Sequence, residues 1–470
     1  MDKRIFQESL NVVNVGVSHF AESLEAQGVA TTQVGWRPPA DGKLSALLHK
    51  LEGSDLEQKI NKANEQVLQI MLEGDPFWIG MKSAGEVIPG MKPNMILHAG
   101  PPISWERMSS VQKNGILGGI LHEKLASNYE EALTLIEQGK VTFGPANDLV
   151  AVGAGVGITT YSMPVNICEN KKTGKRAYCI PFEGRDGLGA WGVYNESVEE
   201  NLKMLEEVFA PSVDAVLVKN GGIAIKQIIA QGLQMSDETH TRQTAQGLVL
   251  VSQIVPMLLD SDLDKSTASL CIKTFLSSER WFHPLGMAGS FSVVQSAKNI
   301  PFSTIVSAIC SNGVDTGLKV GSLGEQWFIA PAPPMVGQYL STKWGPEDCL
   351  PYLGDSTVTE VAGLGAFSAA AAPVVLRLRD GGWREAIQQS EEMKTITIGI
   401  NHNYPIPLLD FTGPPIGIDI RKVVETGITP ICHGGIISKD GGQAGAGAAR
   451  FPMDVYTQAL RAFFEKHDIS

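Results

Sequence analysis

The sequence predicts a multidomain protein of mixed α/β and α+β class. Its 470 residues exceed what one hydrophobic core usually organises. Strand-like and helix-like segments alternate near the start, the middle is helical almost throughout, and the last third is rich in glycine and proline. We therefore expect four parts: a Rossmann-like α/β domain built on a βαβ unit over 1–105, an α+β segment over 106–195, a helical domain over 196–312, and a Gly/Pro-rich α+β domain over 313–470.

Composition narrows the class of protein. Hydrophobic residues make up 43% and charged residues 19%, which is an ordinary globular balance, and the net charge of −12 argues against nucleic-acid and anionic-membrane partners. We find no signal-peptide region and no apolar run long enough to span a membrane, so a cytoplasmic location is expected. The six cysteines lack any C-x-x-C or zinc spacing and are expected to be reduced and buried.

The N-terminal pattern predicts a βαβ unit. A strand at Val12–Val15 precedes a helix from Ser18 to Gln27, and a second strand covers Val29–Trp36. The first turn has one glycine, Gly16, where a dinucleotide-binding loop needs three, so a structural role is favoured over NAD binding and no cofactor is expected. The start of the helix can still hold an anion.

Helices are expected at 43–52 and 55–73, and strands at 77–81 and 95–98 extend the α/β layer. Ser104 then caps a helix over 105–124, with Glu106 and Arg107 in its first turn. An arginine is electrostatically out of place at a helix N-terminus. Either a bound anion or a carboxylate elsewhere in the chain explains Arg107, and both explanations stay open.

The remaining elements follow from the same rules. A hairpin is expected around Cys168 and 176–181, and the glycines of 150–158 lack the ending of a P-loop. Helices are expected at 196–209, 219–231, 237–259, 264–279, 287–299 and 303–312. The last third should contain a small-residue helix at 363–372, strands at 395–399 and 416–420, a glycine loop over 434–447 and a helix at 453–466.

Residues 234–243 are the first candidate for chemistry. They open a helix whose continuation, Leu248–Leu259, is apolar on nearly every face and is expected to be buried. On helical spacing Asp237 and His240 share one face, so the carboxylate can orient the imidazole for proton transfer. Glu238 and Arg242 pair at i, i+4 as structural support. A solvated first turn is the alternative, and two ligands are too few to predict a metal site.

Other catalytic motifs are absent from the sequence. There is no nucleophile elbow and no H-E-x-x-H pair. His433, beside the glycine loop, is the one further histidine of interest. The residues alone therefore indicate a multidomain cytoplasmic enzyme or subunit with an anion-binding cleft.

Segments along the whole chain, in the same order, resemble the YlbE/YahG family, which includes AllG-like proteins. The matching segments are Val13–Gly16, Gly35–Pro39, Gly100–Met108, Ala230–His240, Asn312–Val314, Leu323–Pro333, Gly354–Ser356 and Gly417–Gly427.

The resemblance implies a subunit of oxamate carbamoyltransferase in anaerobic allantoin breakdown. Such proteins act with FdrA-like and AllH-like subunits and transfer a carbamoyl group between oxalurate and phosphate. The expected ligands are phosphate, carbamoyl phosphate and oxamate-like or oxalurate-like acids, and a homo-oligomer is also expected. His240 and Asp237 are then the catalytic candidates. The substrate-binding or anion-binding candidates are Glu106, Arg107, Arg242, Asn312, Asp355, Ser356 and Glu360.

Two other hypotheses stay open. The chain can be a non-catalytic assembly subunit whose βαβ unit binds a nucleotide-like or acyl-carrier ligand while an FdrA-like partner does the chemistry. It can also be a metal-dependent hydrolase, in which case Asp237 would hold the metal.

Overall fold

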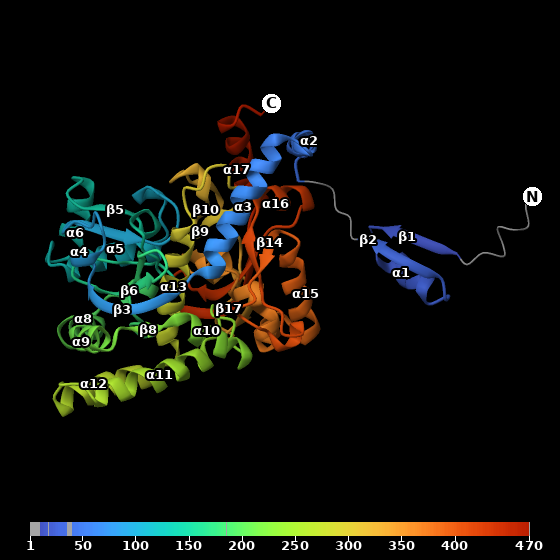
Figure 1. Cartoon of the computed structure of the whole chain (residues 1–470). Coiled ribbons are helices and arrows are strands. Elements are labelled where there is room, and N and C mark those ends of the chain that lie inside the picture. The colour runs from blue at the N-terminus through green and yellow to red at the C-terminus, as the bar shows by residue number, and fades with distance from the viewer. Residues whose placement is uncertain (1–9, 17, 35–39, 185, 470) are drawn as a thin grey trace, which may run out of the picture.

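The structure, a computed structural model, describes residues 10–16, 18–34, 40–184 and 186–469. At its start, β1 (Asn11–Val15), α1 (Ser18–Glu25) and β2 (Ala30–Val34) form the predicted parallel βαβ unit (Figure 1). The last two residues of the predicted second strand lie outside the described residues. Among the described strands, β1 and β2 pair only with each other. A Rossmann-like domain reaching residue 105 is therefore not confirmed.

The next predicted strands form, but in two other sheets. β3 (Pro76–Ser83) lies inside an antiparallel sheet of order β7-β6-β3-β8, whereas β4 (Met95–His98) pairs in parallel with β5 (Thr142–Pro145). The predicted hairpin is confirmed as β6 (Pro164–Asn170) and β7 (Lys175–Cys179). The sheet ends on the short strand β8 (Ile223–Ala224).

The predicted helices at 43–52 and 55–73 are confirmed as α2 (Gly42–Leu51) and α3 (Asp55–Glu73). α5 (Ser110–His122) lies inside the predicted helix at 105–124, whereas α6 (Tyr129–Glu137) was not predicted. The predicted start of α5 is wrong: residues 105–107 form a separate 3₁₀ turn, and Ser109 caps α5 by accepting a hydrogen bond from the backbone N–H of Gln112 at 3.3 Å.

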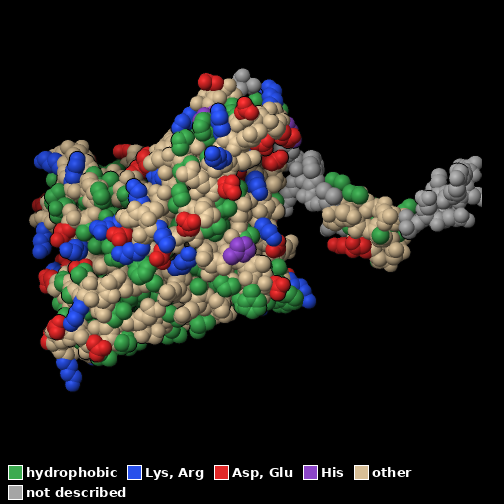
Figure 2. Space-filling model, in the orientation of Figure 1, with side chains coloured by type: hydrophobic (Ala, Val, Ile, Leu, Met, Phe, Trp, Pro, Cys, Tyr) green, Lys and Arg blue, Asp and Glu red, His purple; other side chains and the backbone are tan. Residues whose placement is uncertain are grey.

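The middle of the chain is helical, as predicted. Its helices are α8 (Glu196–Met204), α9 (Ala210–Asn220), α10 (Ile225–Gln234), α11 (Thr244–Leu259), α12 (Lys265–Leu276) and α13 (Phe282–Ser296). The predicted full burial of α11 is wrong, since Leu248 and Leu259 are 60% and 66% exposed. Figure 2 shows hydrophobic side chains exposed at the lower edge of the view, where α11 and α12 lie.

The predicted helix at 303–312 is also wrong, because Val306–Asn312 is strand β9. Every residue of β9 is buried, so the strand shows no alternation of apolar and polar residues. β9 lies in an antiparallel sheet of order β11-β10-β9-β13. Its partners are β10 (Asp315–Val320), β11 (Phe328–Pro331) and β13 (Leu353–Gly354).

Two further sheets complete the C-terminal part. β12 (Val336–Tyr339), β17 (Gln443–Arg450) and β16 (Ile431–Ile437) form one, and β14 (Thr397–Ile400) pairs with β15 (Pro415–Ile418) in the other. Much of the predicted glycine loop is therefore paired strand. Its glycines let backbones approach closely: a Cβ at Gly445 or Gly447 would collide with the backbone of β12.

The predicted helix at 363–372 is a 3₁₀ segment, Gly365–Ala371, with a kink at Ser368. It begins at Gly365 with φ +57°, where a Cβ would collide with the carboxylate of Glu360. The segment packs against α15 (Trp383–Lys394) and β16. The chain ends in α17 (Met453–Lys466), as predicted.

The largest hydrophobic cluster joins helices of the middle to sheets of the last third. Buried side chains of α13 and β9 meet those of α17 in it. Within the described part of the chain, we find no helix with the length and apolar character that crossing a membrane requires. As predicted, every cysteine is reduced and buried: Cys168, Cys179, Cys271, Cys310, Cys349 and Cys432.

One buried histidine ties α5 to α8 and the turn that follows it. Nδ1 of His122 lies 2.7 Å from a carboxylate oxygen of Glu199, and Nε2 lies 2.7 Å from one of Glu206. Burial lowers the pKa of His122, but the two carboxylates outweigh burial and raise that pKa from 6.5 to about 9. The histidine is therefore charged at neutral pH and bridges two acids.

We expect His122→Gln to destabilise the fold in a pH-dependent way. A pKa raised on folding stabilises fully below the unfolded value near 6.5, and the contribution is lost as pH rises toward 9. The contribution is at most on the order of 3 kcal/mol. Equilibrium urea unfolding between pH 6 and 10 should show a gap between wild type and variant that closes above pH 9. A gap independent of pH would contradict the charged bridge.

Candidate functional site

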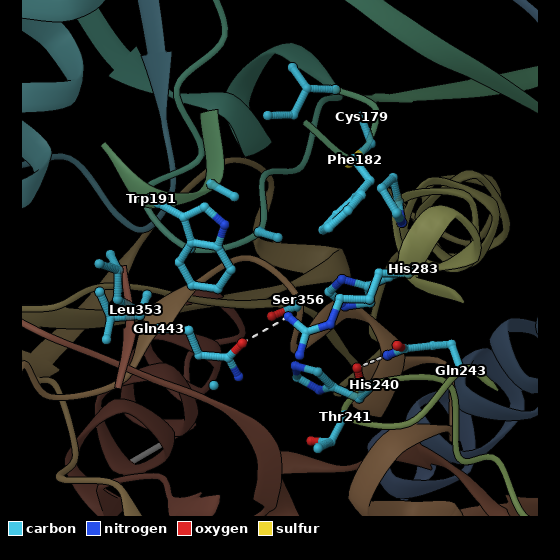
Figure 3. A pocket seen from close by; sticks show the side chains of 18 of the residues that line it. Cys179, Phe182, Trp191, His240, Thr241, Gln243, His283, Leu353, Ser356 and Gln443 are labelled. Atoms are coloured by element: carbon cyan, nitrogen blue, oxygen red, sulfur yellow. Dashed lines mark hydrogen bonds between the residues drawn. The ribbon is translucent and has the colours of Figure 1, made fainter. Parts of the chain in front are cut away.

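A cavity of about 120 Å³ lies where the middle helices meet the C-terminal sheets (Figure 3). Its apolar wall includes Ile180, Phe182, Trp191 and Leu353. Its polar side contains Arg280, His283 and His240, with Gln443 from β17. The cavity thus combines a cation and two imidazoles with an apolar wall, the usual composition of a small-molecule site.

These four polar side chains form two contacting pairs. Arg280 donates a hydrogen bond from Nη1 to Oε1 of Gln443 at 2.9 Å. The rings of His240 and His283 stack with centroids 5.7 Å apart and planes 22° from parallel. Arg280 lies in the 3₁₀ turn Glu279–Trp281, and His283 lies in the first turn of α13, which follows directly. One short segment therefore brings both side chains into the cavity.

His240 lies on a loop and not on the predicted helix, which begins only at Thr244. Ser236 and Thr239 have positive φ, which ends regular helix there. The carboxylate of Glu238 then accepts the backbone N–H groups of His240 at 3.0 Å and Arg242 at 2.8 Å, and also that of Thr241. Glu238 is fully buried. It therefore holds the loop as a compact anion-centred turn.

Two of the predicted pairings in this loop are wrong. Asp237 does not hold His240: it accepts the backbone N–H of Gln246 at 2.7 Å and so caps α11. The guanidinium of Arg242 reaches Asp237, with Nε 3.6 Å from Oδ1, and not Glu238. Both errors follow from applying helical spacing to residues that are not helical.

The carboxylate that holds His240 is Glu360, at the end of α14 (Val358–Val361). Both carboxylate oxygens lie 2.9 Å from Nδ1 of His240. Because Nδ1 is occupied and His240 lines the cavity, Nε2 is the ring nitrogen left for a ligand.

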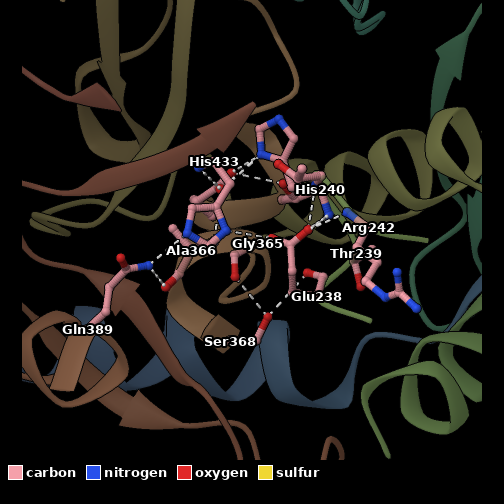
Figure 4. A network of polar contacts seen from close by, with 12 residues as sticks. Glu238, Thr239, His240, Arg242, Gly365, Ala366, Ser368, Gln389 and His433 are labelled. Atoms are coloured by element: carbon pink, nitrogen blue, oxygen red, sulfur yellow. Dashed lines mark hydrogen bonds and ion pairs between the residues drawn. The ribbon is translucent and has the colours of Figure 1, made fainter. Parts of the chain in front are cut away.

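Glu360 and Glu238 are joined through a second histidine (Figure 4). Nδ1 of His433 lies 3.0 Å from Oε2 of Glu238, and the backbone N–H of His433 donates to Oε1 of Glu360 at 3.2 Å. Each glutamate therefore holds one histidine ring and the backbone of the other histidine. We call Glu238, His240, Glu360 and His433 the Glu–His brace.

The brace sets the charge of His240. Burial lowers the pKa of His240, but the carboxylate of Glu360 outweighs burial, and the net direction is upward. Burial raises the pKa of Glu238, but His433 and the backbone N–H groups outweigh it, and the net direction is downward. His240 is therefore held toward its protonated form by the carboxylate of Glu360.

His283 has the opposite character. Burial, followed by the charges of His240 and Arg280, moves the pKa of His283 well below its usual value, so the ring is neutral. Within the described residues, Nε2 of His283 and Oγ1 of Thr241 have no hydrogen-bond partner, and both residues line the cavity. Unsatisfied buried polar groups at a cavity wall are available to a ligand.

Several predicted anion-binding residues lie outside the cavity lining. Nη2 of Arg107 lies 2.7 Å from Oδ1 of Asp315, which is the carboxylate alternative considered for this arginine, and Glu106 adjoins it in the same turn. Asn312 accepts the backbone N–H of Asp315 at 2.7 Å and shapes the turn between β9 and β10.

Ser356 does line the cavity, and its neighbour Asp355 supports the wall from behind. Asp355 accepts the backbone N–H groups of Gly100 at 2.8 Å and Gly153 at 3.0 Å. Burial raises the pKa of Asp355 to about 7. Among the predicted residues, the structure thus brings together His240, Glu360 and Ser356. Their chemical roles stay predictions.

Sequence reasoning missed Arg280, His283 and Gln443. The signal that was present is Arg280 and His283 three positions apart, with an aromatic pair between them. Among the described residues, no three histidine, cysteine, aspartate or glutamate side chains are grouped as a metal site.

Comparison with known proteins gives relatives along the whole chain. The family model of oxamate carbamoyltransferase subunit AllG matches residues 141–356. The uncharacterized protein YahG of Escherichia coli K12 is 34% identical over 473 residues, covering 100% of both chains. The oxamate carbamoyltransferase subunit AllG of the same organism is 35% identical over 415 residues, covering 87% of this chain and 99% of its own.

A solved structure shares the fold. It is a conserved protein of unknown function from Enterococcus faecalis V583, with a TM-score of 0.85 and 32% identity. The match covers 89% of this chain and 100% of that chain. The mixed α/β architecture with several small sheets is therefore that of a known structure.

We expect Glu238→Gln to lower the free energy of unfolding by about 3–5 kcal/mol, because it removes the buried carboxylate that holds the ring of His433 and the turn around His240, and each hydrogen bond to a charged group contributes about 1.5–3 kcal/mol. Glu391→Gln is the matched control. Glu391 is exposed and its partner Lys394 lies 3.5 Å away, so the change should stay below about 1 kcal/mol. Equilibrium urea unfolding measures both. Equal effects of the two substitutions would show that Glu238 does not hold the loop.

Proposed function

The chain belongs to the family of AllG-like and YahG-like proteins, and from this premise we propose that it is a subunit of a carbamoyltransferase resembling oxamate carbamoyltransferase. The proposed reaction converts oxalurate and phosphate to oxamate and carbamoyl phosphate, or uses a related carbamoyl donor. We also propose that it works in a cytoplasmic multisubunit complex with FdrA-like and AllH-like subunits.

The observation that carries the proposal is the composition of the cavity. Arg280, His240 held toward its charged form and neutral His283 line the same 120 Å³ space. A small acid with an adjacent carbamoyl group needs a cation for its carboxylate or for phosphate, and hydrogen-bonding groups for its amide. Those are the groups that this cavity provides.

The proposed reaction is a transfer of the carbamoyl group from the oxamate nitrogen to phosphate, with His240 carrying the proton. A phosphate oxygen attacks the carbamoyl carbon of oxalurate, a P–O–C bond forms, and the bond from that carbon to the oxamate nitrogen breaks. His240 donates a proton from Nε2 to the departing nitrogen and regains one from the attacking phosphate. Arg280 binds an anionic group of the substrates, and Nε2 of His283 and Oγ1 of Thr241 hydrogen-bond the carbamoyl group.

Glu360 acts in this scheme as a positioning residue. It fixes Nδ1 of His240, so that Nε2 faces the cavity, and it favours the protonated ring. Asp237, Arg107, Arg242 and Asn312 support the surrounding loops through the contacts described above. They take no part in the proposed proton transfer or in substrate binding.

We expect His240→Gln to lower kcat by about 10²–10⁴-fold, because the variant cannot transfer the proton. His402→Gln, at an exposed histidine away from the cavity, is the matched control and should keep wild-type activity. The assay is phosphate-dependent oxalurate cleavage by the reconstituted complex, with the isolated chain measured in parallel. Full activity of His240→Gln in the complex would overturn the role and favour a non-catalytic assembly subunit.

We expect Glu360→Gln to move the alkaline limb of the kcat profile to lower pH. His240 acts as a proton donor, so activity falls as pH rises through its pKa. Removing the Glu360 carboxylate lowers that pKa. Glu360→Asp keeps the charge and should restore part of the shift. A lower kcat with an unmoved limb in Glu360→Gln would mean that Glu360 only supports the fold.

A further inference from the structure

A second cavity, of about 250 Å³, includes in its lining Gln389, which contacts His433 of the Glu–His brace. It is formed by the end of the 3₁₀ segment Pro373–Arg379, by α15, and by the outer ends of β16 and β17. Two arginines, Arg379 and Arg450, line it together with Glu385 and Glu392. No residue of its lining is shared with the first cavity.

The charged side chains around this cavity differ in their partners, because one arginine has an ion pair and the other does not. Arg450 is engaged by Glu392, with Nη2 2.5 Å from Oε2, and by the backbone oxygen of Thr429 at 2.7 Å. Glu385 accepts the backbone N–H of Gly382 at 2.8 Å and so caps α15. Arg379 donates to the neutral side chain of Gln389 and forms no ion pair within the described residues.

Arg379 is therefore a half-buried cation that has no carboxylate partner within the described residues, and it lines the same cavity as the guanidinium of Arg450. Burial and the charge of Arg450 both lower the pKa of Arg379, which agrees with this crowding. A charge taken partly out of water is expected to be paired, and an oxyanion is the ligand that a guanidinium fork fits best.

We propose that this cavity is a second anion site, which binds a small carboxylate or phosphate through Arg379 and Arg450. The site is separate from the carbamoyl chemistry proposed for the first cavity and does not depend on it.

The site is in direct contact with the Glu–His brace. Oε1 of Gln389 accepts the hydrogen bond from Arg379, and Nε2 of Gln389 lies 3.0 Å from Nε2 of His433. His433 in turn holds Glu238, whose carboxylate forms the turn at His240. Figure 4 shows Gln389, His433 and Glu238 in this order. An anion that draws Arg379 toward itself removes the hydrogen bond from Arg379 to Gln389. Because Gln389 also contacts His433, anion binding should change the environment of the His433 ring.

The binding test uses isothermal titration calorimetry of the full chain at constant ionic strength. Inorganic phosphate and malonate are separate arms, because the first is a phosphate and the second a carboxylate. In protein carrying Arg280→Gln, which removes the cation of the first cavity, binding of at least one probe should persist. Adding Arg379→Gln should weaken it about tenfold or more. Arg379→Lys, which keeps the charge but not the fork, should weaken it less.

Arg384→Gln is the matched control, because Arg384 lies on α15, stacks on Trp383 and does not line the cavity. It should leave binding unchanged. In ¹⁵N-histidine-labelled Arg280→Gln protein, the ring signal of His433 should shift on saturation with the bound probe, and Arg379→Gln should abolish the shift. Loss of all binding in Arg280→Gln, equal binding with and without Arg379→Gln, or an unmoved His433 signal would overturn the proposal.

Discussion

The candidate site depends on the Glu–His brace, in which each of two glutamates contacts the ring of one histidine and the backbone N–H of the other. Glu360 holds the ring of His240 and the backbone of His433, while Glu238 holds the ring of His433 and the backbone of His240. All four residues are buried. An ionised carboxylate at such a depth is stable only when its hydrogen bonds are satisfied, so the loss of one member leaves charge unpaired on the others.

The brace explains why the fold brings these segments together. The loop before α11, helix α14 and strand β16 come from distant parts of the chain, yet a few hydrogen bonds join them. Gly365 lies against Glu360, where no side chain fits. The same brace presents His240 to one cavity and touches the lining of another through Gln389. Fold stability and the charge of the candidate proton donor therefore share one set of contacts.

Local patterns predicted much of the fold. The βαβ unit, the β6–β7 hairpin and the C-terminal helix follow from apolar periodicity and turn residues. β9 was missed because a strand buried on both faces has no period, and the loop at 237–243 was missed because Glu238 replaces helical hydrogen bonds with side-chain ones. The sequence also indicated His240, but could not name Glu360 as its partner, since helical spacing relates only near neighbours. Arg280 and His283 lack a motif, and the fold alone shows that they face a cavity.

The central claim is that the space between Arg280 and His240 is where the carbamoyl substrate binds. A crystal structure of the assembled complex with carbamoyl phosphate tests it most directly. The account predicts the phosphate group on the guanidinium of Arg280 and the carbamoyl group within hydrogen-bond distance of Nε2 of His240. Carbamoyl phosphate bound elsewhere in the complex, with this cavity free of ligand, would contradict it.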